Sequence, residues 1–174
     1  MPNADFQNTV YLQSGNPETE ARAPDSYSAG QMGSKITVKV GGVAKTYQLV
    51  LVGTLPVAMV DNAVVWWEDR AAHTVTTDAS APGRGHVAGI ARATAVVGQV
   101  TCIQIAGRGD VKFLAAPTAA PTAAGLICTP SATDAEADCL AAGTAADYPT
   151  IGVSASAPTA AVAAVDIDIE SAAP

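Results

Sequence analysis

Few side chains in this chain could act as catalysts. Histidine, the residue most often used as a general base near neutral pH, occurs only as His73 and His86. Asp69 precedes His73 by four residues, a spacing that brings side chains together on a helix but not on a strand. Ser80 and Ser131 lie in no G-x-S-x-G motif. The sequence therefore predicts no catalytic residue, and a β-sandwich hydrolase whose triad assembles only in space stays open as an alternative.

Two glycine-rich tetrapeptides could bind a ligand or a receptor. GRGH at 83–86 and GRGD at 107–110 lack the spacing of a phosphate-binding loop, so no nucleotide or other cofactor is predicted. Arg108 and Asp110 raise the alternative of a receptor-binding or adhesion module, with the RGD tripeptide at an exposed loop tip. Gly107 and Gly109 favour instead a tight hairpin turn between two strands, in which Asp110 accepts from a backbone amide.

The candidate metal ligands form no known pattern. Alternating Asp166, Asp168 and Glu170 line one face of a predicted strand and could in principle bind Ca²⁺, but they lack EF-hand spacing. The three cysteines, an odd number, show no C-x-x-C spacing and are predicted to be buried free thiols. No metal site is predicted.

The charge of the chain is unevenly distributed. The net charge is -7, yet residues 1–112 hold nine acidic and nine basic residues, and no Lys or Arg follows Lys112. The acidic last third is either a solvated face or a surface complementary to a basic partner. So few basic residues predict no nucleic-acid binding. No signal peptide or membrane-length apolar run is visible, which indicates a soluble protein made in a cytoplasm.

Period-two alternation of apolar and polar residues predicts a series of short strands. KITVKV at 35–40 and KTYQLVLVG at 45–53 predict a hairpin with its turn at 41–42. Further strands are expected at 57–60, 63–68, 73–78 (as a short edge strand), 87–91, 99–106, 111–115 and 162–170, with a turn near 97–98 before the strand at 99–106. Pro117 and Pro121 favour an extended connection, with a possible sub-boundary near 115–125.

One helix is predicted, at about 133–142. Thr133 can cap it, Glu136 completes a capping box, and Gly143 ends it. The predicted fold class is mainly β: an antiparallel β-sandwich, jelly-roll-like or barrel domain over 35–174, with this one short helix.

An extended N-terminal arm is predicted over residues 1–34, which are polar with scattered apolar anchors. Trp66 and Trp67 are adjacent on a strand, so at most one is expected to face the core of its own domain. The other is expected either in an interface, where Trp is common, or beneath the arm. The predicted interface residues are Phe6, Tyr11, Leu12, Trp66 and Trp67.

Two segments of the second half resemble a known family. HVAGIARATAVVGQVTCIQIAG at 86–107 and DYPTIGVSASAPTAAVAAVDIDIE at 147–170 look like the small capsid decoration, or cement, proteins of tailed bacteriophages. The matching residues are 87–91 with 100–107, and 151–153 with 165–169. The first half, the paired tryptophans and the Ala-Pro-Thr segment carry no such resemblance.

The resemblance implies a structural role without enzymatic activity. Proteins of this family sit on the outer capsid surface and tie neighbouring major capsid proteins together. It implies a virion protein assembled in the host cytoplasm, whose partners are the major capsid protein and further copies of itself. A homotrimer is favoured over a dimer, and no membrane or nucleic-acid partner is expected.

Overall fold

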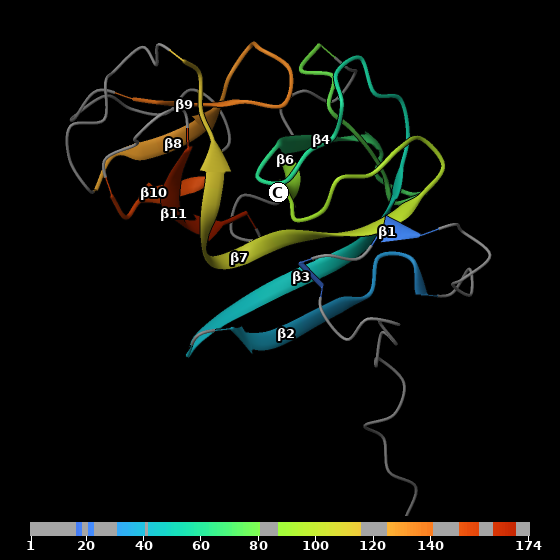
Figure 1. The fold of residues 1–174 in the computed structure, drawn as a ribbon, viewed down its shortest axis with the longest axis horizontal. Helices are drawn as coiled ribbons and strands as arrows, with labels where there is room; N and C mark the ends of the chain where they lie inside the picture. Colours follow the sequence, from blue (N-terminus) through green and yellow to red (C-terminus); the bar gives the residue numbers. More distant parts are fainter. Residues whose placement is uncertain are drawn as a thin grey trace, which may run out of the picture.

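The computed structural model describes residues 17–18, 21–22, 31–40, 42–80, 87–115, 125–140, 150–156 and 162–169. They form eleven β-strands and no α-helix (Figure 1). The prediction of a mainly β fold is confirmed. The strands are β1 (Ala21–Arg22), β2 (Lys35–Val40), β3 (Val43–Val52), β4 (Val64–Asp69), β5 (Thr74–Thr76), β6 (Val87–Ala91), β7 (Val100–Lys112), β8 (Ile127–Pro130), β9 (Ala137–Cys139), β10 (Gly152–Ser154) and β11 (Val162–Asp168).

All the strands belong to one mixed sheet. Ten follow the order β2-β3-β5-β4-β6-β7-β11-β10-β8-β9, and β1 pairs with β7. Because β3 pairs with β7 as well as with β5, strands β3, β5, β4, β6 and β7 form a closed ring of pairings. The β3–β5 pairing is parallel. The predicted edge strand at 73–78 is thus β5, which lies inside the sheet between β3 and β4.

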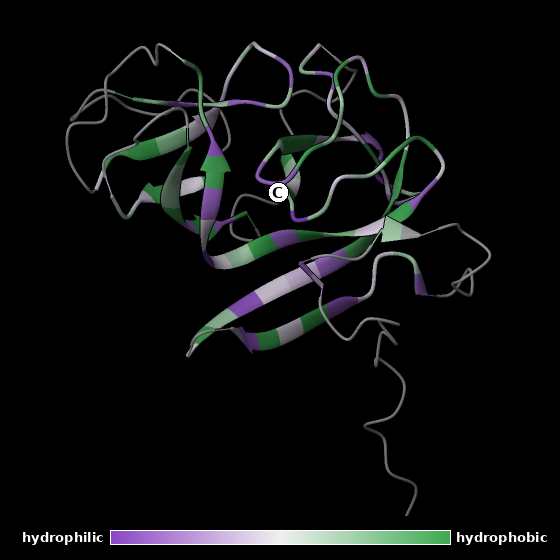
Figure 2. Cartoon of the chain, in the orientation of Figure 1, coloured by the Kyte–Doolittle hydropathy of each residue, from purple (hydrophilic) through white to green (hydrophobic). Residues whose placement is uncertain are grey.

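Two apolar clusters make up most of the core. Strands of the ring direct alternate side chains into one cluster, which includes Val50, Val65, Val75 and Ile103. The other lies among β4, β6 and the last five strands of the order, and includes Phe113, Ile151 and Val165. Figure 2 shows the apolar colour of the start of β4 and of β6, in contrast with the alternating colours along β2. The central strands are apolar because they have a core on both faces.

Several predicted elements are confirmed. β2 and β3 form the predicted antiparallel hairpin, and β6 has the predicted bounds 87–91. The turn near 97–98 is present, with Gly98 at a φ of 83°. Along β11 the alternation is as predicted, with Val165 and Ile167 buried and Asp166 and Asp168 exposed.

The predicted hairpin turn at GRGD is wrong. Residues 100–112 form the single strand β7, whose first part pairs with β3 and whose last part pairs with β11. Gly107 lies where the strand passes from one partner to the other, with a φ of 89°. A Cβ built on Gly107 would lie 2.2 Å from the carbonyl oxygen of Ala44. The glycine is therefore needed for a close approach within a strand and not for a turn.

The predicted helix at 133–142 is also wrong for the part that the structure describes. Residues 133–136 form the turn of a hairpin, and β9 pairs with β8. Glu136 N donates to the Thr133 carbonyl, and Ser131 N donates to the Glu136 carbonyl. Ala135 has a φ of 63°, which a helix cannot include. Residues 141–142 lie outside the described residues.

The described part of the predicted N-terminal arm packs on its own chain. β1 adds to β7, with Ala21 opposite Thr101, and Glu18 accepts hydrogen bonds from Lys45 and Tyr47. At the proposed sub-boundary, residues 116–124 lie outside the described residues, but strands on both sides of this segment belong to one sheet. None of the described segments is a helix long and apolar enough to cross a membrane.

Candidate protein–protein interface

Both tryptophans are buried within the chain. Trp66 is 0% and Trp67 9% exposed, and they belong to different apolar clusters. The prediction that at most one could face the core of its own domain is wrong because β4 has a core on each of its faces. Neither Trp66 nor Trp67 is therefore an exposed interface residue. Phe6, Tyr11 and Leu12, the other predicted interface residues, lie outside the described residues.

Exposed valines lie instead on two loops that are joined to each other. One loop, 53–63, leads from β3 to β4, and the other, 92–99, leads from β6 to β7. An antiparallel bridge joins Met59 to Ala95, whose N donates to the Met59 carbonyl at 3.2 Å. These two side chains are buried. Four valines beside them are 37% to 62% exposed, and we call them the valine patch: Val57, Val60, Val96 and Val97.

The loop around Val57 is fixed by side chains and not by a strand ladder, so the strand predicted at 57–60 is wrong apart from the bridge at Met59. Thr77 Oγ1 donates to the Val57 carbonyl at 2.7 Å, and Thr76 Oγ1 donates to the Thr54 carbonyl at 2.6 Å. Thr54 in turn donates to Glu68. These bonds fix the backbone of the loop around Val57, which reduces the ordering cost of binding a partner.

Hydrogen bonds also fix the loop that carries Val96 and Val97. Gly98 N donates to the Val52 carbonyl and Val52 N donates to the Gln99 carbonyl, both at 2.8 Å. Gln99 Oε1 also accepts from Val96 N. Single exposed apolar residues are common, but several on neighbouring rigid loops are typical of a binding surface. Two adjacent valines within a predicted turn were the signal in the sequence that could have revealed this patch.

A charged network borders the valine patch and is centred on Arg92, whose side chain is 5% exposed. Its guanidinium donates from Nε to Gln104 Oε1, and from Nη1 to Asn62 Oδ1 and the Asp110 carbonyl. Asp61 Oδ1 lies 4.0 Å from Nη1. Burial lowers the pKa of Arg92, and the negative charge of Asp61 opposes that shift. We call this group the Arg92 network.

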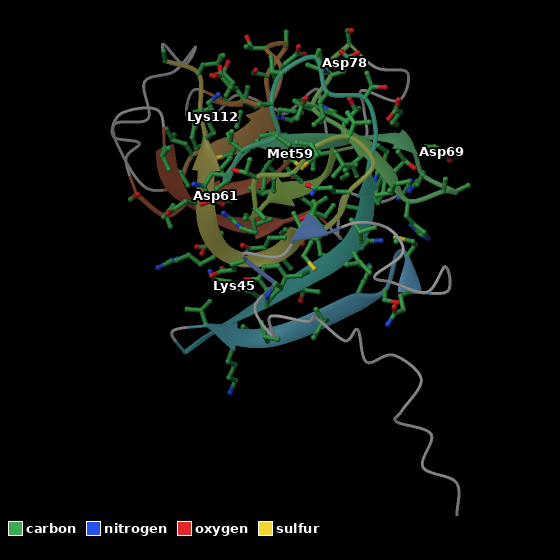
Figure 3. All side chains as sticks on the ribbon, turned by 45° about the vertical axis from the view of Figure 1, so that its right-hand side comes forward. Lys45, Met59, Asp61, Asp69, Asp78 and Lys112 are labelled. Carbon is green, nitrogen blue, oxygen red and sulfur yellow. The ribbon has the colours of Figure 1, made fainter. Side chains whose placement is uncertain are left out.

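A polar cavity of about 170 Å³ opens beside the Arg92 network. Lys45 and Asp61, both labelled in Figure 3, line it together with Glu18, Asn62, Arg92 and Asp110. Two basic and three acidic side chains line the cavity, and Lys45 pairs with Glu18 at 2.6 Å. The arrangement is that of a structural network of paired charges, and Asp61 gives the adjacent valine patch a polar rim.

Glu18 gives this network a pH dependence. Burial alone would raise the pKa of Glu18, but hydrogen bonds from Lys45 and Tyr47 and the charge of Lys45 lower it below its ordinary value of 4.5. A carboxylate whose pKa is lower in the folded chain stabilises the fold above its unfolded pKa. That stabilisation is lost as the pH falls below 4.5 and through the folded pKa.

We therefore expect Glu18→Gln to weaken the pH dependence of stability below pH 4.5. The measurement is the thermal midpoint of both proteins at a series of pH values on either side of the Glu18 pKa. The wild type should lose more of its midpoint on acidification than the variant does. Parallel curves for the two proteins would show that Glu18 is not coupled to folding.

The residues considered for catalysis are engaged in local structure. Asp69 Oδ1 accepts from the backbone of Ala71 and Ala72, which forms a turn and leaves His73 stacked edge-on against Trp67. Ser80 donates to Asp78, and Ser131 donates to the Thr133 carbonyl. His86 lies outside the described residues. Among the described residues, no group of three or more His, Cys, Asp or Glu could hold a metal ion.

The RGD tripeptide lies within a strand and not at a loop tip. Arg108 and Asp110 are exposed on β7, and the Arg108 guanidinium pairs with Asp166 of β11 at 2.9 Å. The geometry proposed for the adhesion alternative is thus absent at this position. No family model matches the chain, and no curated protein is significantly similar to it in sequence.

Proposed function

We propose that this chain is a structural protein of the virion, a decoration or cement protein on the outer surface of a tailed-bacteriophage capsid. In this role it binds neighbouring major capsid proteins and stabilises the shell. It acts through protein–protein contact and needs no cofactor. Self-association, as a homotrimer in preference to a dimer, is part of the proposal.

The observation that carries the proposal is the valine patch. Four exposed valines on two hydrogen-bonded loops, with Asp61 next to Val60 in the sequence, have the composition of an interface centre with a polar rim. The apolar area of a single patch is small. Contacts with several neighbours, as in a symmetric shell, would add their affinities without requiring a larger patch on each copy.

The arrangement of the family-like segments gives further support. Residues 87–91 and 100–107 form β6 and the first part of β7, and residues 151–153 and 165–169 include the first two residues of β10 and the end of β11. These four strands are consecutive in the sheet, in the order β6-β7-β11-β10. The resemblance thus falls on one continuous part of the fold and not on scattered segments.

A sedimentation experiment tests the proposal. Expanded capsids of the phage that carries this sequence, prepared without this chain, are mixed with the purified full chain and centrifuged through a sucrose cushion. The chain should sediment with the capsids, saturate at a fixed number of copies, and appear as added outer density in cryo-electron microscopy. A chain that stays in the supernatant at all concentrations would rule the proposal out.

We expect Val97→Glu to weaken this binding by about tenfold or more, because it places a charge in the centre of an apolar contact. The matched control is Val43→Glu. Val43 is 40% exposed but lies at the β2–β3 hairpin, away from the two loops (Figure 1). The measurement is the bound fraction of each variant in the sedimentation assay. Equal binding by both variants would remove the valine patch from the interface.

A further inference from the structure

Two of the three cysteines face each other across a pair of strands. All three are buried and none is in a disulfide, as the sequence predicted. Cys128 of β8 and Cys139 of β9 are direct partners in the antiparallel register, and their Sγ atoms lie 3.8 Å apart. Cys102 belongs to a different apolar cluster on β7 and has no part in this pair.

The backbone around the two cysteines has the geometry that a disulfide requires. Leu140 N donates to the Ile127 carbonyl, and Ser131 N donates to the Glu136 carbonyl. Hydrogen-bonded pairs alternate along an antiparallel ladder, so the pairs on either side of the two cysteines are hydrogen-bonded. Cys128 and Cys139 therefore occupy a non-hydrogen-bonded pair, in which the Cα atoms are about 4.5 Å apart. This separation lies within the range found in protein disulfides, so rotation of the side chains can close the remaining gap between the sulfurs.

We propose that Cys128 and Cys139 are a dithiol that a small-molecule disulfide, such as oxidised glutathione, converts to an intrachain disulfide. The bond closes the β8–β9 hairpin covalently. The inference does not depend on the proposed function, because it rests only on the register, the sulfur distance and the position of β9.

The reaction proceeds by two thiol–disulfide exchanges. The Cys139 thiolate attacks one sulfur of oxidised glutathione, and a glutathione thiolate leaves. The Cys128 thiolate then attacks Sγ of Cys139, which breaks the mixed disulfide and releases the second glutathione. The protein loses two electrons and two protons, and the glutathione disulfide gains the electrons. The contact between the two thiols lowers the pKa of Cys139 and raises that of Cys128, so Cys139 is the first nucleophile.

The position of β9 gives the oxidant access to these buried sulfurs. β9 has three residues and stands last in the strand order. Within the described residues, its other side is held by one bridge, from Phe113 to Ala137, and by the bond from Leu114 N to the Ala137 carbonyl. Local opening of so short a terminal strand costs less free energy than global unfolding.

The disulfide would also stabilise the packing of the β8–β9 turn, residues 133–136, on the ring of strands β3, β5, β4, β6 and β7. Ala135 packs in the apolar cluster inside the ring, its N donates to the Thr77 carbonyl, and its carbonyl accepts from Val64 N. Asp134 Oδ1 accepts from Ala79 N at 2.8 Å. The disulfide therefore stabilises a contact between the two parts of the core as well as the hairpin itself.

Intact-mass spectrometry after alkylation under denaturing conditions tests the proposal on the full chain. After treatment with oxidised glutathione, one of the three cysteines should be alkylated, and proteolysis should yield one linked peptide pair containing Cys128 and Cys139. Three alkylated cysteines, a stable glutathione adduct, or a link to Cys102 would overturn the proposal.

Thermal denaturation supplies a second measurement. Closing a loop of this length should raise the thermal midpoint of the oxidised protein by roughly 5–10 °C over the reduced protein. Cys102→Ser should keep the shift, and Cys128→Ser and Cys139→Ser should abolish it. If Cys128→Ser and Cys139→Ser fail to fold, Cys102→Ser is sufficient to test the proposal. Its oxidised form must contain the Cys128–Cys139 disulfide and show the higher thermal midpoint. An oxidised Cys102→Ser protein with neither the disulfide nor the higher midpoint would refute the proposal.

Discussion

Gly107→Ala should lower the free energy of unfolding by about 2–4 kcal/mol, because it combines a strained backbone angle with a steric clash. The φ of 89° is unfavourable for any residue with a Cβ, and this Cβ would lie 2.2 Å from the carbonyl oxygen of Ala44. Gly107 is paired with Ile167 of β11, and Ala44 is paired with Lys39 of β2, so neither backbone can move without disturbing a strand ladder. Urea denaturation followed by circular dichroism measures the loss.

Gly42→Ala is the matched control for this prediction. Gly42 has a similar φ of 84°, but a Cβ built there meets no atom within 4 Å. The control should therefore lose only the cost of the backbone angle, about 1 kcal/mol. Equal losses in the two variants would show that the close approach to Ala44 contributes nothing.

Arg92→Met should lower the free energy of unfolding by about 3–5 kcal/mol, the usual cost of removing one partner from a buried charged network. Gln104, which is 0% exposed, would lose the donor to its Oε1, and Asn62 Oδ1 and the Asp110 carbonyl would lose theirs. The negative charge of Asp61 would then face no cation at that position. The measurement is again urea denaturation.

Two further variants separate the loss of the Arg92 hydrogen bonds from the loss of an arginine side chain in general. Arg70→Met removes the same side chain from an exposed position and should change stability by less than about 0.5 kcal/mol. Arg92→Lys keeps the charge but cannot donate to three acceptors from a planar group. Its free energy of unfolding should therefore lie between that of Arg92→Met and that of the wild type. Arg92→Met behaving like Arg70→Met would contradict the role of Arg92 as the centre of the network.

Strands with one solvent-facing side were predictable from the sequence. In β2 and β11, alternation reflects one apolar and one polar face, so the period-two pattern gave both the strand and the exposed side chains. β6 was located by its flanking turn residues and its small apolar composition.

Features that depend on pairing between distant residues were not predictable in the same way. The sequence TDAEADC has good local helix signals, but Ala137 and Cys139 gain more by pairing with β8 and packing in the core. The burial of both Trp66 and Trp67 required a second core, which the last third of the chain supplies from far along the sequence. The Arg92 network joins three separate segments, the two loops at 61–62 and 92 and the strand β7, and no local pattern reveals it.

The long strand β7 has a mechanical consequence. Its residues 100–106 pair with β3, and residues 106–112 pair with β11, so it connects the two halves of the fold through continuous backbone. The hydrogen bonds of an antiparallel ladder are perpendicular to the strands. A force that pulls β3 and β11 apart along β7 must therefore shear many of these bonds together instead of opening them one at a time. The fold should therefore resist a pulling force in that direction, and Gly107 lies at the point of β7 where the β3 ladder ends and the β11 ladder continues.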